Sequence, residues 1–148
     1  MQISSPARQV CWGALASVAL IGTWAQILDY LKMPFLQAQV QFWRDTALQP
    51  VGRFATIDLV LLVLAVSVWM LAEARRLRIR FVWLYITYGC GIAFSSALPL
   101  FMLMRERALA RRGETESSLA TGDQIGLLPL VLFSLGYLWF ATRAAFPG

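Results

Sequence analysis

The sequence predicts an all-α, polytopic membrane protein with four transmembrane helices and a short interfacial helix in the first loop. Four long apolar runs occur within 148 residues, each close to the ~20 residues that a helix needs to cross a bilayer core. Hydrophobic residues make up 59% of the chain and charged residues only 14%, whereas a globular domain averages ~25% charged residues. The runs also lack the polar face of a soluble amphipathic helix. We therefore expect one membrane domain, residues 1–148.

The predicted spans are residues 10–28, 55–74, 81–104 and 125–142. The first has Trp12 and Trp24 within it and only Arg8 before it, so we expect a retained span rather than a cleaved signal peptide. The segment 34–48 begins at Pro34, a residue that suits a helix start. Its apolar residues recur at helical spacing opposite a polar side, which is typical of a helix in the headgroup plane. A loop packed over the helix ends is the alternative.

The third span combines small residues with a proline. Gly89, Ala93 and Ala97 recur at four-residue intervals with Ser96 beside them, a stripe that lets another backbone approach closely. Pro99 removes one hydrogen-bond donor from the helix, so we expect a bend near Ser96. Packing between helices is one role for such residues, and contact with a ligand or a partner is the other. The candidate contact residues are Trp69, Tyr85, Gly89, Ala93, Ser96 and Ala97.

The arginines gather in short segments beside the apolar runs. The stretch 75–80 holds four arginines in six residues, and the positive-inside rule places this short turn, with both termini, in the cytoplasm. The segment 105–112 after the third span carries four more, so the charges on the two sides nearly balance. We favour the denser turn as the cytoplasmic side.

Two carboxylates lie at opposite ends of the second span. Asp58 and Glu73 are about 60° apart around the helix at ~100° per residue. Asp58 lies inside an apolar run, where an ionised carboxylate needs a partner. In an antiparallel hairpin of the second and third spans, the start of one lies beside the end of the other, so we expect Arg105 and Arg107 to pair with Asp58.

Glu73 has a different set of candidate partners. Arg76 lies close to it on the same helix, and Arg143 or Arg8 approach from neighbouring spans. In this interpretation the acids form ion pairs that hold the helix ends. The alternative is that Asp58, with Glu73, serves as a catalytic acid or a ligand contact.

The composition excludes several classes of site. The chain has no histidine, the commonest ligand of haem and catalytic zinc and the commonest proton shuttle, so we expect no metal and no cofactor. Cys11 and Cys90 should lie at different membrane depths, and we expect no disulfide between them. The basic residues form no groove interleaved with aromatic residues, so we expect no nucleic-acid partner.

Three motifs resemble a family of small bacterial membrane proteins, the domain of unknown function 2834. QPVGRFATIDL (49–59), EARRLRIRFVWLYI (73–86) and SSALPLFMLMRERAL (95–109) are similar in order and spacing to the family's N-P-x-x-x-F-x-x-x-D-L, E-G-R-R-L-G-I-R-x-x-W-L-Y-I and S-x-A-L-P-L-F-L-x-x-R-E-R-x-L. Ala74 and Arg78 replace glycines of that pattern. The resemblance covers about Pro50–Leu109 and implies a multi-pass protein of the bacterial inner membrane, with no established activity.

The sequence favours a non-catalytic role. We expect an accessory subunit of a larger membrane complex, or a binder of lipid-like or isoprenoid molecules, since six tryptophans offer flat apolar surfaces to ligands or partner helices. One alternative is a membrane-embedded enzyme that uses Asp58 as an acid on an isoprenoid or lipid. Another is a small transporter or channel, although repeated halves are absent. The expected partners are membrane lipids and a membrane protein or a second copy of the chain.

Overall fold

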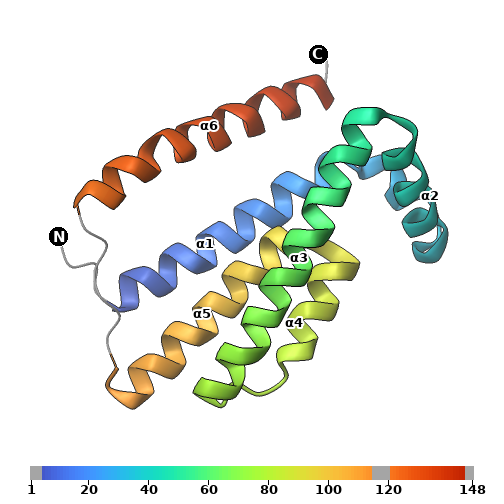
Figure 1. Cartoon of the computed structure of the whole chain (residues 1–148). Helices are drawn as coiled ribbons and strands as arrows, with labels where there is room; N and C mark the ends of the chain where they lie inside the picture. Colours follow the sequence, from blue (N-terminus) through green and yellow to red (C-terminus); the bar gives the residue numbers. More distant parts are fainter. Residues whose placement is uncertain (1–4, 115–120, 146–148) are drawn as a thin grey trace.

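The computed structural model describes residues 5–114 and 121–145, and these residues are helical apart from short turns (Figure 1). The all-α prediction is therefore confirmed. The elements are α1 (Ser5–Trp24), a 3-10 helix (Leu28–Lys32), α2 (Phe35–Leu48), α3 (Pro50–Leu77), α4 (Val82–Tyr88), a π-helical turn (Gly89–Ala93), α5 (Phe94–Arg112) and α6 (Thr121–Ala145).

Within residues 5–114 and 121–145, three helical stretches, not the predicted four, are long and apolar enough to cross a membrane: Pro50–Leu77, Val82–Arg112 and Ile125–Arg143. The first predicted span, 10–28, falls short because α1 ends at Trp24 and begins with polar residues. Its apolar helical part, 10–24, is only about 22 Å long at 1.5 Å per residue. A bilayer core is about 30 Å thick. The three remaining stretches suggest a membrane protein.

The stretch Val82–Arg112 does not run straight. At Ala93 the backbone is extended, with φ −164° and ψ 108°, and the chain reverses so that α4 and α5 lie side by side (Figure 1). The rings of Tyr85 and Phe101 are 5.9 Å apart between centroids, although a straight helix would separate these positions by about 24 Å. Residues 82–112 therefore form a helical hairpin whose two ends lie at the same end of the molecule.

The position of this reversal differs from the predicted bend. A bend near Ser96 was expected from Pro99, but the chain turns at Ala93, and Pro99 lies within the second turn of α5. Side chains of α2 and α1 contact the tip of the hairpin. The Gln39 side chain of α2 donates a 2.8 Å hydrogen bond to the Gly91 carbonyl, and the hydroxyls of Thr23 and Ser95 lie 3.2 Å apart.

Because the chain reverses, α5 runs parallel to α3 and antiparallel to α1. Met70 and Phe101 are fully buried in one core cluster, and Leu77 packs with Leu109 in another. The first residues of α1 lie beside the last turns of α5, since Gln9 accepts a hydrogen bond from Arg107 at 3.4 Å. α5 is thus the central helix of the structure.

α2 and α6 lie outside this core. A helix at Phe35–Leu48 agrees closely with the predicted segment 34–48. α6 touches the end of α1, where Gln26 and Thr142 share a 3.5 Å hydrogen bond, and no part of its apolar stretch Ile125–Arg143 is buried. It runs apart from the other helices in Figure 1.

Candidate functional site

The run Arg105-Glu106-Arg107 on α5 joins three helices through its side chains. Arg105 Nε donates a 2.7 Å hydrogen bond to Glu73 Oε1 on α3. Glu106 forms an ion pair with Arg8 on α1, with Arg8 Nε 3.2 Å from Glu106 Oε2. Glu73, Arg105 and Glu106 are all buried. A buried charge is tolerated only with partners, so these pairs specify how α1, α3 and α5 pack.

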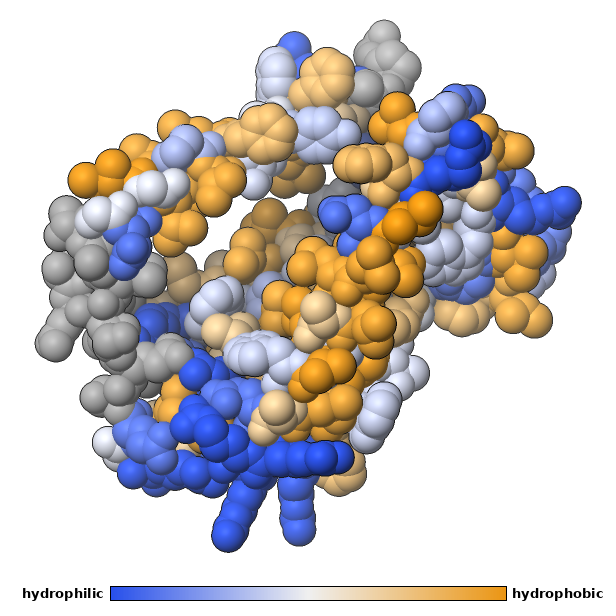
Figure 2. Space-filling model, viewed as in Figure 1, coloured by the Kyte–Doolittle hydropathy of each residue, from blue (hydrophilic) through white to orange (hydrophobic). Residues whose placement is uncertain are grey.

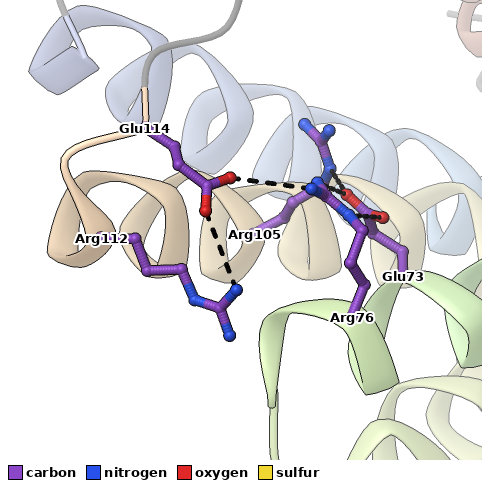
Figure 3. Close-up of polar contacts among 5 residues, drawn as sticks. All are labelled: Glu73, Arg76, Arg105, Arg112 and Glu114. Carbon is purple, nitrogen blue, oxygen red and sulfur yellow. Dashed lines mark hydrogen bonds and ion pairs between the residues drawn. The ribbon is translucent and has the colours of Figure 1, made fainter.

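Glu73 is also held by its own helix. Arg76 Nε and Nη2 donate to the two carboxylate oxygens of Glu73 at 2.8 and 2.7 Å, a two-pronged contact visible in Figure 3. Glu114, just after α5, extends the cluster toward solvent, with Arg76 at 3.6 Å and Arg112 at 3.8 Å. The predicted pair of Glu73 with Arg76 is present in the structure.

The predicted pairing of Asp58 with Arg105 and Arg107 is wrong. Arg105 bonds to Glu73, near the opposite end of α3, and Arg107 contacts Gln9 of α1. The prediction assumed antiparallel helices, whereas the reversal at Ala93 makes α5 parallel to α3. Asp58 is exposed and forms no hydrogen bond or ion pair with any residue that the structure describes.

Neither of the other two arginines proposed for Glu73 reaches it. The Arg143 guanidinium lies 4.4 Å from the centroid of the Trp139 ring on its own helix, a cation–π contact. Arg8 is at the correct end of the molecule, but it pairs with Glu106.

The stripe of small residues is an internal surface. A Cβ atom placed on Gly89 would lie 3.0 Å from the Ala97 Cβ and 2.5 Å from a ring carbon of Phe94, so glycine permits α4 and α5 to approach closely. Ser96 is buried, with Tyr88 Oη 3.3 Å from its hydroxyl. The predicted close approach is present, and the backbone that approaches belongs to the same hairpin.

Trp69 and Tyr85 both contact Phe101, edge to face, with centroids 5.8 and 5.9 Å apart. Trp69 remains 41% exposed on α3. Tyr85 also lines a groove at the end of the molecule where the ion pairs lie. Of the six predicted contact residues, Tyr85 is therefore the one that this groove exposes to a ligand.

This groove has a volume of about 880 Å³ and lies between the α3–α4 turn, α4 and the last half of α5. Its apolar and aromatic lining is Leu77, Ile79, Phe81, Leu84, Tyr85, Tyr88, Leu100, Met104 and Ala108. Its basic lining is Arg78, Arg80, Arg111 and Arg112. In Figure 2 hydrophilic residues gather along the lower edge, where α3 and α5 end, and hydrophobic residues cover α3 above them. The groove therefore combines an apolar wall with a basic edge.

The turn that carries two of these arginines has an unusual backbone. Arg78 and Phe81 have φ values of 54° and 60°, the left-handed region that glycine adopts most easily. Arg78 ends α3, and its amide hydrogen-bonds to the Arg75 carbonyl at 3.4 Å. The tight turn keeps residues 78–81 beside the end of α5.

Sequence reasoning missed the groove because it assigned its two arginine segments to opposite membrane faces. The signal was present as two dense basic runs, 75–80 and 105–112. The groove forms only because the hairpin returns the second run to the first. The described residues contain no group of three or more cysteine or carboxylate side chains that would hold a metal ion.

A family model described as "Protein of unknown function DUF2834" matches residues 12–107. The match runs from α1 to the Arg105–Arg107 run of α5 and stops before α6. No curated protein and no solved structure matches the chain.

Proposed function

Since the chain belongs to this family of proteins of unknown function, we propose its role from geometry: a non-catalytic integral membrane protein that binds a lipid-like molecule in the groove beside α4 and α5. The observation that carries the proposal is the groove itself. Its volume of about 880 Å³ lies within the ~300–1,000 Å³ of ligand pockets, and such pockets combine apolar walls with a few polar groups.

The distribution of charge supports one orientation in the membrane. Nine of the 13 lysines and arginines lie at the groove end of the molecule. They are Arg8, Arg75, Arg76, Arg78, Arg80, Arg105, Arg107, Arg111 and Arg112. A straight third span would divide the basic residues almost equally between the two membrane sides. The hairpin instead brings both basic runs to one end. The positive-inside rule then favours this end as cytoplasmic.

This orientation revises the expected position of one terminus. α1 starts at the groove end and, together with the 3-10 helix after it, leads to the far end, where α3 starts. α3 returns to the groove end, and the hairpin begins and ends there. α6 ends beside the far end of α1, as the contact between Gln26 and Thr142 indicates. We therefore propose that α1 begins on the cytoplasmic side of the bacterial inner membrane and that α6 ends on the other side.

The enzyme hypothesis receives less support from this geometry. It required Asp58 in an enclosed apolar site, but Asp58 is exposed and lines neither this groove nor the smaller cavity between α2 and α3. A role as accessory subunit has a specific observation in its favour. None of the apolar stretch of α6 is buried. A neighbouring membrane protein can therefore contact most of this helix, apart from the part near Leu138 and Thr142 that meets α1.

The lipid-binding proposal is tested by filling the groove. Leu100→Trp adds volume at the groove lining, and Leu61→Trp makes the same change on an exposed face of α3. Native mass spectrometry of protein extracted gently from membranes should show one retained lipid in the wild type and in Leu61→Trp. Leu100→Trp should lose it. A wild-type protein that retains no lipid, or equal retention in both variants, contradicts the proposal.

A further inference from the structure

We propose that the ligand is an anionic phospholipid of the cytoplasmic leaflet, with its phosphate held among Arg78, Arg80 and Arg111 and an acyl chain along the apolar wall of the groove. This inference rests on the proposed lipid-binding function and adds the chemical class of the headgroup. It arises from the hairpin, which brings together arginines 31 and 33 positions apart in the sequence around one apolar groove.

Arg78, Arg80 and Arg111 differ from Arg112, the fourth arginine of the groove, in having no acidic partner among the described residues. Arg105 and Arg76 bond to Glu73, and Arg112 lies near Glu114. Arg78, Arg80 and Arg111 form no ion pair with any carboxylate in the described part of the chain. Like charges gathered around one groove repel one another, and a polyatomic anion relieves that repulsion.

Phosphate fits this arrangement better than a simple anion. A guanidinium presents a planar fork of N–H donors that matches two phosphate oxygens at once. Arg78 and Arg80 come from the α3–α4 turn and Arg111 comes from the last turn of α5. Donors from opposite walls can therefore contact different oxygens of one phosphate.

The backbone at Arg78 adds an independent argument. Its φ of 54° is a left-handed conformation that costs an L-residue free energy and costs glycine almost none. Strained residues of this kind concentrate at binding sites, where the surrounding structure holds them. An arginine at this position supplies a charge to the groove that glycine lacks.

The apolar wall selects a membrane lipid over free phosphate. Leu84, Tyr85, Leu100 and Met104 line the groove next to the arginines, and burying an acyl chain against them contributes free energy for each methylene. Anionic lipids are abundant in the cytoplasmic leaflet, on the side where the proposed orientation places this end of the molecule.

The test compares phosphatidylglycerol with phosphatidylcholine on the full chain in nanodiscs that contain equal amounts of both. Native mass spectrometry of the released protein counts the lipid retained. The wild type should favour phosphatidylglycerol by about tenfold or more, since each arginine near an anionic surface contributes about as much as a severalfold change in affinity. The variant Arg78→Gln/Arg80→Gln/Arg111→Gln should retain both lipids equally.

The matched control removes three arginines at the far end of the molecule, as Arg44→Gln/Arg53→Gln/Arg143→Gln, and should keep the preference. The single variant Arg78→Gly should unfold at a higher SDS content than the wild type and yet lose part of the preference for phosphatidylglycerol. Misfolding would not produce this combination. An excess of inorganic phosphate should not displace the lipid.

The outcomes separate the two proposals. Equal retention of both lipids by the wild type overturns the headgroup assignment and leaves lipid binding intact. Retention of neither lipid overturns the proposed function. Loss of the preference in the far-end control, or displacement by inorganic phosphate alone, also overturns the assignment to this groove.

Discussion

Arg105 on α5 and Glu73 on α3, 32 positions apart in the sequence, are joined by a 2.7 Å hydrogen bond from Nε to Oε1. Both side chains are about nine-tenths buried. This contact requires α5 to run parallel to α3, because an antiparallel α5 would bring the other end of α3 to Arg105. It also brings the end of α5 to the α3–α4 turn and so creates the groove.

Removing the charge of Glu73 should destabilise the protein strongly. Glu73→Gln removes the charge that the buried Arg105 contacts on α3, and breaking such a buried pair costs about 3–5 kcal/mol. Glu114→Gln is the control, since Glu114 is 46% exposed and exposed pairs contribute about 1 kcal/mol or less. Unfolding in mixed micelles of rising SDS content measures both. Similar losses for the two variants would show that burial of Glu73 does not matter.

The hairpin makes a direct prediction about distance. Arg80 and Arg111 line the same groove, whereas a straight helix would separate these positions by about 46 Å. Spin labels on Arg80→Cys and Arg111→Cys, with Cys11 and Cys90 replaced by alanine, should report a distance far below that value. The same two cysteines should react with a membrane-impermeant thiol reagent from one side of inverted vesicles. Labelling from opposite sides would exclude the reversal at Ala93.

Gly89 should be among the positions least tolerant of a larger side chain. The added Cβ in Gly89→Ala meets Phe94 and Ala97 at 2.5 and 3.0 Å, and overpacking of this kind costs about 1–3 kcal/mol. Gly91→Ala meets no heavy atom within 4 Å and should be neutral or slightly stabilising. Unfolding midpoints of the two variants provide the comparison. A tolerated alanine at position 89 would mean that α4 and α5 are not in close contact.

The contact between the 3-10 helix and α2 should weaken at alkaline pH. The Tyr30 hydroxyl donates a hydrogen bond to Asp45, and this bond, with burial and the Asp45 charge, raises the pKa of Tyr30 above its ordinary 10.0. The folded state therefore holds this proton more tightly than the unfolded state. The resulting stability is complete below pH 10 and is lost as pH rises through the raised pKa.

Tyrosinate absorbance provides the measurement for Tyr30. The difference between the wild-type titration and that of Tyr30→Phe should be centred above the ordinary tyrosine pKa. Asp45→Asn should shift the centre back toward 10, since the main cause of the shift is removed. A difference curve centred at 10 in the wild type would mean that this hydrogen bond does not form.

Patterns along the chain predicted much of the fold. The lengths and apolarity of 55–74 and 125–142 anticipated α3 and α6, and helical spacing after Pro34 anticipated α2. The pair of Glu73 and Arg76 was also predictable, because residues three apart on one helix are neighbours whatever surrounds them. All of these features depend on local geometry or on the cost of exposing backbone groups to lipid.

The sequence by itself determined that the chain forms apolar helices suited to a bilayer and that its arginines occur in two dense runs. The tertiary structure decided that the second run returns to the first. Small residues at Gly89, Gly91 and Ala93 allow the helix to be interrupted there. Their presence does not determine whether the chain continues straight or reverses. The contacts of Gln39 with Gly91 and of Glu73 with Arg105 join distant segments, and their energy favours reversal over continuation. The groove follows from that choice.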